Sequence, residues 1–203
     1  MAAFDETPPT QARLLDATAR LTYTSGICAT GMDLIVKASG VARKSIYRYY
    51  STKETLVAAA LQRRSERWMQ WFIGEISGAP TPAERWSSIF PALRRWFESD
   101  NFRGCAFTNA TGEIDNPNSP IRAVCRLHKQ RLLDYLCQLA EACDVDDPKE
   151  AARQILVLID GAISVALVTG DASIADCAGQ VASKLAGIPA AGPSMHHFSP
   201  PNF

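Results

Sequence analysis

Residues 30–56 read TGMDLIVKASGVARKSIYRYYSTKETL, and this stretch decides the fold. Two short segments with helical spacing of apolar residues, 32–39 and 43–50, are separated by Gly40 and Val41. Glycine adopts a positive φ at little steric cost, so it allows two helices to meet at a steep angle, which Val41 is expected to fill. Two short helices joined in this way are the layout of a helix-turn-helix. The inner side of the first helix is predicted to carry Leu34, Ile35 and Ala38.

Helices are also predicted on both sides of this pair. Before it, apolar residues recur at helical spacing through 11–21, and Gly26 ends that helix. After it, Ser51 and Glu54 match a capping box, in which two residues satisfy each other's backbone N–H groups at a helix start. The box is expected to begin a long helix that ends near Gly78.

The rest of the chain continues the helical pattern. Further helices are predicted at 81–100, 104–113, 149–168 and 173–185, together with a long helix that follows the loop 116–120. The apolar side of that long helix is marked by Leu127, Leu132, Leu136 and Leu139. No segment alternates between apolar and polar residues over a useful length, as a strand does, so the predicted fold class is all-α.

Composition restricts the class of protein. The 203 residues are 47% hydrophobic, with 21 basic and 21 acidic side chains, which is ordinary for a soluble globular protein. The N-terminus has no basic region followed by an apolar run. The longest apolar stretch, 155–169, is interrupted by Asp160 and is shorter than the ~20 residues of a membrane span. A soluble, cytoplasmic protein without a membrane partner is expected.

The six cysteines form no CxxC pair and no Cys/His cluster. Metal ligands in proteins are usually grouped at short, characteristic spacings. Neither a metal site nor a cofactor is therefore predicted, and the cysteines are expected to be reduced thiols.

Charge is uneven along the chain although it cancels overall. Residues 34–53 contain no acid. The cations of this segment are Lys37, Arg43, Lys44, Arg48 and Lys53, interleaved with Ser45, Tyr47 and Tyr49. Hydroxyl groups of such residues donate to phosphate oxygens. A basic, aromatic segment of this kind is either a solvated helix face or a surface for nucleic acid.

The spacing of this segment closely resembles the DNA-binding signature of the TetR/AcrR family of repressors. The resemblance rests on Gly40-Val41, Ile46-Tyr47, Tyr50 at the family's usual phenylalanine, Lys53-Glu54 and Leu56. The chain departs from the pattern at Gly31, Leu34, Val36 and Ser39. The first departure removes a threonine that would cap the second helix and contact phosphate. Affinity is therefore expected to rest more on Tyr47, Tyr49 and Lys53.

The resemblance implies a role for each polar residue of the signature. The residues expected to contact DNA are Arg43, Lys44, Ser45, Tyr47, Arg48, Tyr49 and Lys53. Arg43 and Arg48 are expected to read bases, because a guanidinium group bonds guanine O6 and N7 together. The two tyrosines resemble phosphate contacts, and Lys53 lies in a first helical turn, where free N–H groups favour phosphate. The residues expected in the core are Ile35, Val41, Ile46 and Tyr50.

Members of the family typically hold an inducer among their long helices, and the second half of this chain is rich in aromatic residues. The predicted ligand-binding residues are Trp68, Trp71, Phe72, Trp96, Phe107, Asn109 and His128. Such residues suit an apolar pocket between helices, and the alternative is that they are ordinary core. Thr108 and Glu113 are further candidates, either for a ligand or for a helix end. A small, apolar or aromatic inducer is expected.

The family also dimerises through its last two helices. In this chain the helix from Lys149 has wider apolar coverage than one core face needs. A four-helix bundle between two copies is therefore the predicted dimer. The predicted dimerisation residues are Ile155, Ile159, Ala162, Ile163, Ala166, Val181 and Leu185.

Together these patterns predict a flexible N-terminus (1–9), a helix-turn-helix DNA-binding domain (10–57), a helical ligand-binding and dimerisation domain (58–186) and a disordered tail (187–203). The predicted function is a ligand-responsive transcriptional regulator, a repressor that binds double-stranded operator DNA as a homodimer and is released by the inducer. The alternatives are a helical adaptor or small-molecule-binding protein that does not act on DNA, and an enzyme that uses the helical cavity. No Ser/His/Asp arrangement, paired carboxylates or glycine-rich phosphate loop supports an enzyme.

Overall fold

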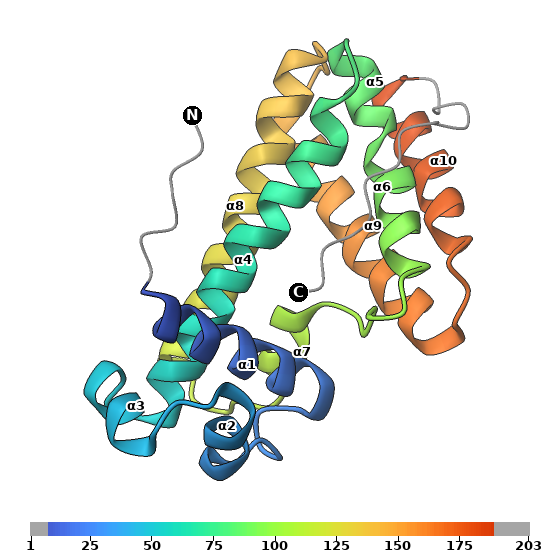
Figure 1. The fold of residues 1–203 in the computed structure, drawn as a ribbon. Coiled ribbons are helices and arrows are strands. Elements are labelled where there is room, and N and C mark those ends of the chain that lie inside the picture. Colours follow the sequence, from blue (N-terminus) through green and yellow to red (C-terminus); the bar gives the residue numbers. More distant parts are fainter. Residues whose placement is uncertain (1–7, 189–203) are drawn as a thin grey trace. The chain divides into compact units, whose positions relative to one another are not determined.

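The computed structural model describes residues 8–188, and every regular element in that range is an α-helix (Figure 1). In chain order the helices are α1 (Pro9–Ser25), α2 (Met32–Ser39), α3 (Arg43–Tyr49), α4 (Lys53–Ser77), α5 (Pro82–Ser87), α6 (Ile89–Phe97), α7 (Ala106–Gly112), α8 (Pro120–Ala142), α9 (Pro148–Thr169) and α10 (Ile174–Ala186). The all-α fold class is confirmed. Of the segments expected to be flexible or disordered, 1–9 and 187–203, all but residues 8, 9, 187 and 188 lie outside the described range.

The described residues form two compact units that are interleaved along the chain. The first unit, here called the head, comprises residues 8–66 and 106–126, and the second, the body, comprises residues 67–105 and 127–188. Helices α4 and α8 each contribute to both units. The head is larger than the segment 10–57 expected from the sequence, because α7 and the first turns of α8 group with the first three helices.

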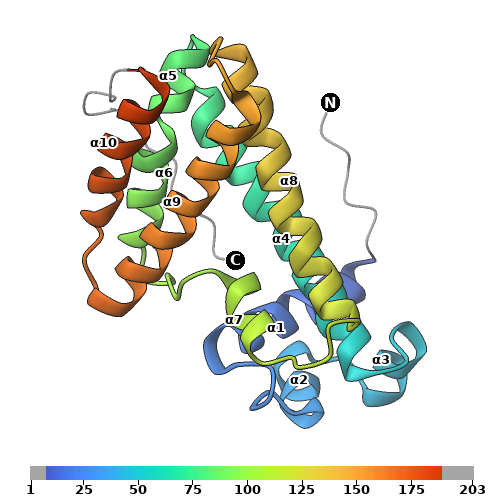
Figure 2. The ribbon, with the colours of Figure 1, turned by 180° about the vertical axis from the view of Figure 1, so that it is seen from behind.

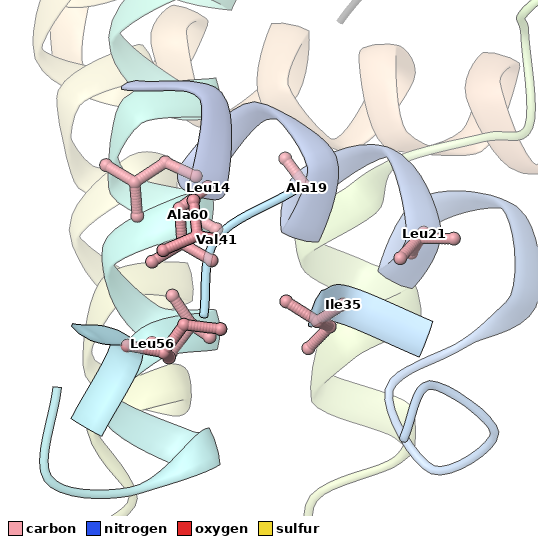
Figure 3. Close-up of a cluster of buried hydrophobic side chains, with 9 residues drawn as sticks. Leu14, Ala19, Leu21, Ile35, Val41, Leu56 and Ala60 are labelled. Carbon is pink, nitrogen blue, oxygen red and sulfur yellow. The ribbon is translucent and has the colours of Figure 1, made fainter. Parts of the chain in front are cut away.

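The head is built around an apolar cluster between its first four helices (Figure 3). The buried members are Leu14, Leu15, Ala19, Leu21, Ile35, Val41, Ile46, Leu56 and Ala60. Val41 is 3% exposed, which fits its predicted place in the angle between α2 and α3. Tyr50 packs against the cluster with its ring partly buried, and its hydroxyl accepts a hydrogen bond from Gln11 Nε2 at 2.7 Å. The predicted core of the helix-turn-helix is therefore confirmed.

The inner side of α2 differs from the prediction. Ile35 faces the core, but Leu34 is 40% exposed and Ala38 is also exposed. Instead Ser39, one turn beyond Ile35, is buried. An eight-residue helix buries a single stripe, and five apolar residues among eight do not reveal which stripe it is.

The start of α4 also differs in detail. The expected capping box of Ser51 and Glu54 is wrong, and the reciprocal pair is Thr52 with Thr55. The Thr52 hydroxyl accepts from the Thr55 N–H at 3.0 Å, and the Thr55 hydroxyl accepts from the Thr52 N–H at 3.1 Å. The Glu54 carboxylate accepts instead from the hydroxyl of Ser119, a residue far along the chain.

In the body, α6, α9 and α10 pack against one another and lie side by side in both views (Figures 1 and 2). The single helix expected at 81–100 is instead two helices, α5 and α6, divided at Ser88. Pro91 explains the division. Proline has no N–H to donate to the carbonyl four residues earlier, here that of Ser87, so the helical ladder is interrupted.

The long helices α8 and α9 largely follow the prediction. The Asp147 side chain caps α9 by accepting from the Glu150 N–H at 3.1 Å. The buried leucines of α8 are Leu132, Leu136 and Leu139. Leu127 is 48% exposed, against the prediction. It lies one position away from the buried stripe, which passes through His128 at helical spacing from Leu132.

Candidate nucleic-acid interface

Helix α3 exposes a cationic face and is anchored by one buried residue. That anchor is Ile46, which is 1% exposed. The exposed residues of the helix are Arg43, Lys44, Tyr47, Arg48 and Tyr49, and Ser45 is half-buried. All six predicted DNA contacts on α3 therefore keep at least part of the residue accessible.

The turn between α2 and α3 determines how this face is presented. Gly40 ends α2 with a φ of 66°, in the left-handed region that favours glycine. Its N–H donates to the Val36 carbonyl at 3.0 Å, and the Val41 N–H donates to the Ser39 hydroxyl at 3.2 Å. With Val41 buried beneath it, the turn has both its backbone groups and its side chain held in place.

Two cations of this face are oriented by neighbouring side chains. The Arg43 guanidinium pairs with Asp33 of α2, whose side chain is 95% exposed. The Arg48 guanidinium lies over the Tyr49 ring, 5.4 Å from its centroid. Asp33 is the only acid between residues 17 and 53. Because exposed salt bridges contribute little to stability, this pair orients Arg43 more than it stabilises the head.

Lys53 contacts the loop between α1 and α2 instead of extending into solvent. Its Nζ donates to the Ile27 carbonyl at 2.6 Å. The same loop is bonded by Glu113, the residue that follows α7: Oε1 accepts from the Ile27 N–H at 2.9 Å and Oε2 from the Cys28 N–H at 2.8 Å. Burial by itself would raise the pKa of Glu113, but the two N–H donors and the charge of Lys53 outweigh it and hold that pKa below its ordinary value. No local sequence pattern indicates that Glu113 contacts this loop, which lies 86 residues earlier in the chain.

Five of the predicted ligand-binding residues come together in the body. The ring centroid of Trp68 lies 4.9 Å from that of Phe72, 5.4 Å from His128, 5.7 Å from Trp96 and 6.0 Å from Trp71. Four of the five are buried, and Trp71 is half-buried. The indole N–H of Trp68 is buried and has no hydrogen-bond partner among the described residues.

The other two predicted ligand-binding residues lie on α7, in the head. Phe107 is 3% exposed and belongs to the core. Asn109 lines a cavity of about 10 Å³, together with Tyr23, Arg64 and Glu113. A cavity of this size holds about one water molecule. The residues grouped by the sequence prediction are thus divided between the two units.

Five of the predicted dimerisation residues are core of the body. Each is at most 5% exposed, and they are Ile155, Ile159, Ala162, Ile163 and Ala166. The other two are accessible, Val181 at 40% and Leu185 at 47%. The prediction missed the exposed apolar residues of α9, which are Val157, Val165, Leu167 and Val168. Because α9 is apolar on more than one side, its periodicity does not reveal which side meets α6 and α10.

The described part of the chain holds no evident metal centre. No three His, Cys, Asp or Glu side chains within residues 8–188 are grouped so that they could hold an ion. The cysteines, at 28, 105, 125, 137, 143 and 177, are free thiols.

Residues 14–60, which form α1 to α3 and the start of α4, match the family model for "Bacterial regulatory proteins, tetR family". The chain is a member of the TetR family. Among curated relatives it is similar to the HTH-type transcriptional regulator YjdC of Escherichia coli (strain K12). The two are 22% identical over 169 residues, which cover 82% of this chain and 87% of YjdC.

Solved structures of TetR-family proteins share the fold over nearly the whole chain. A TetR-family transcriptional regulator from Streptomyces coelicolor matches with a TM-score of 0.80 and 26% identity, covering 88% of this chain and 94% of its own. The reduced form of Escherichia coli NemR matches with a TM-score of 0.82 over 91% of this chain and 100% of its own, and its 19% identity supports the fold alone. The protein is thus an HTH-type transcriptional regulator of a family of ligand-responsive repressors, and its relatives are regulators, not enzymes.

Proposed function

We propose that this TetR-family regulator represses transcription by binding double-stranded operator DNA as a homodimer, with α3 in the major groove. The observation that carries the proposal is the exposed cationic face of α3, anchored by the buried Ile46. The major groove admits an α-helix, and cations close to the phosphates provide most of the affinity. In a two-fold dimer the two α3 helices contact successive major grooves, about 34 Å apart.

The DNA contacts on this face are proposed to be of two kinds. Arg43 and Arg48 read guanine bases through paired hydrogen bonds. Lys44 and Ser45 contact the groove edge, and the two tyrosines of α3 donate to phosphate oxygens. Lys53 contributes a phosphate contact through the N–H groups of its ammonium that remain while one of them donates to the Ile27 carbonyl.

The dimer is proposed to form through an exposed apolar stripe. The stripe consists of Val157, Val165 and Val168 on α9 with Val181 and Leu185 on α10. By length and composition alone, α9 would also pass as a membrane span, with a mean hydropathy of 1.8. One such helix is weak evidence for a span, since α9 packs against α6 and α10 and its Asp160 pairs with Lys129. A second copy of the chain accounts for the apolar outer face in a cytoplasmic protein.

The inducer is proposed to bind at the aromatic cluster of the body. Aromatic rings favour edge-on and offset stacking, which suits a planar, apolar ligand beside Trp68 and its neighbours. A buried N–H without a partner costs about 1–3 kcal/mol, so a ligand with a hydrogen-bond acceptor for the Trp68 indole is favoured. A ligand that prefers the DNA-free state shifts the population away from the operator.

Selection from a pool of random-sequence duplexes tests the DNA proposal without knowledge of the operator. We expect the wild type to enrich a two-fold symmetric sequence. Arg48→Ala should weaken binding to that duplex by about 1–3 kcal/mol, measured by mobility shift at fixed salt. Arg131→Ala, which removes an exposed arginine of the body, is the matched control. A pool that yields no sequence, or equal binding by the two variants, would contradict the proposal.

A further inference from the structure

We propose that Glu113 is a positioning residue for DNA binding: its carboxylate holds the loop between α1 and α2 and thereby fixes the start of α2. The inference rests on the proposed function, because the position of α2 matters only if the head binds DNA. In this inference α7 contributes to DNA binding, because it places Glu113 against the loop. The family model that describes this head ends at residue 60, well before α7.

Both oxygens of the Glu113 carboxylate accept hydrogen bonds from the loop. One oxygen accepts from the Ile27 N–H and the other from the Cys28 N–H, at 2.9 and 2.8 Å. Hydrogen bonds with an ionised acceptor are stronger than those between neutral groups. Lys53 completes the arrangement by donating to the Ile27 carbonyl at 2.6 Å. Both backbone polar groups of Ile27 are therefore bonded to charged side chains, one beside α7 and one on α4.

The loop fits closely against this carboxylate. Gly26 has a φ of +85°, and a Cβ at that position would lie 3.1 Å from each carboxylate oxygen of Glu113. The hydroxyl of Thr30, a fully buried residue, donates to the Gly26 carbonyl at 2.6 Å. Ile27 is 6% exposed. The next residue after Thr30 is Gly31, the N-cap of α2, so a shift of the loop would also move the start of that helix.

A continuous set of contacts leads from Glu113 to α3, the helix proposed to enter the major groove. The loop that Glu113 bonds leads directly into α2. Helix α2 carries Asp33, which pairs with Arg43 at the start of α3. Lys53, itself a proposed phosphate contact, is held by the same loop. Both carboxylate oxygens accept from the loop of the head, so the role proposed for Glu113 is to position that loop.

Glu113→Gln in the full-length protein tests this inference. Glutamine keeps the shape of the side chain, but it replaces one acceptor by an N–H donor facing a backbone N–H, and it removes the charge beside Lys53. Affinity for the duplex selected by the wild type should fall at least fivefold in fluorescence anisotropy. Asp115→Asn removes an exposed carboxylate two residues later and should stay within twofold of the wild type.

Backbone NMR separates positioning from general loss of stability. In Glu113→Gln the amide protons of Ile27 and Cys28 should shift upfield and exchange faster, while amides of the body are unchanged. Glu113→Asp keeps the charge but is shorter, and the same two measurements apply to it if the glutamine variant does not fold. Either of two results would overturn the inference but not the proposed function. One is wild-type affinity for DNA in a variant whose loop amides have changed, and the other is a variant whose loop amides are unchanged. A wild type that selects no sequence would overturn the proposed function and the inference with it.

Discussion

Val168→Asp is expected to convert the protein from a dimer to a monomer without unfolding it. Val168 lies near the end of α9 and is 82% exposed within one copy of the chain. An aspartate there is solvated in the monomer, so the fold of the isolated chain is not disturbed. In the proposed two-fold dimer the same position is buried twice, once from each copy.

The size of the effect follows from that exposure and from symmetry. Burying an exposed valine side chain contributes about 1.5–3 kcal/mol, and most of this remains to be gained when Val168 is buried by a partner. Two copies give about 3–6 kcal/mol, before the cost of desolvating two carboxylates. Since about 1.4 kcal/mol is a factor of ten in affinity, the dissociation constant of the dimer should rise at least about a hundredfold.

Sedimentation equilibrium at micromolar concentration measures this change. The wild type should have twice the chain mass of 22.1 kDa, and Val168→Asp should have the single-chain mass. Leu127→Asp, at a 48% exposed position on α8, is the control for an added charge and should remain dimeric. Ile159→Asp should instead unfold the body, because Ile159 is 0% exposed. A dimeric Val168→Asp, or a monomeric wild type, would refute the reasoning.

Two further predictions concern the head. Asp33→Asn removes the only acid between residues 17 and 53, so affinity for random-sequence duplexes should rise while the preference for the selected duplex falls, because Arg43 loses the partner that orients it. Anisotropy titrations at one salt concentration measure both quantities, and an unchanged ratio would contradict the role given to Asp33. Because the pKa of Glu113 is held below its ordinary 4.5 in the folded head, its carboxylate contributes stability that is complete above this pH and is lost as the pH falls through the lower folded value. The free energies of unfolding in urea of the wild type and Glu113→Gln should therefore differ at neutral pH and converge in acid. A difference independent of pH would contradict the stabilising role of the ionised Glu113 carboxylate.

The helix-turn-helix could be predicted from the sequence because its determinants are close together. Gly40, Val41 and Ile46 lie within one short stretch, and each has the conformation or burial that its residue type favours there. The division between α5 and α6 was not predicted, although Pro91 lies close to it, because the apolar spacing on both sides is that of one continuous helix. The inner stripe of α2 was not readable, because Leu34 and Ile35 are equally apolar and only one of them is buried.

The candidate sites were predicted less completely than the fold. Trp68 and its aromatic neighbours were named as one group, and most of them do form one cluster in the body. Phe107 and Asn109, named with them, belong to the head. Residue type indicated what these side chains can bind, whereas the division of the chain into two interleaved units decided which of them are neighbours.

By itself, the sequence determined the all-helical fold, the helix-turn-helix and the cationic face of α3, because each depends on residues within a few helical turns of one another. Tertiary structure alone decided that Glu113 bonds a loop 86 residues away and that Ile159 faces inward while Val157 faces outward. Spacing shows that a helix has an apolar side, but not which neighbour covers it. Which side of a helix is covered is settled only when helices distant in the sequence pack together. The same packing brings Glu113 to the loop and leaves the apolar stripe of α9 exposed.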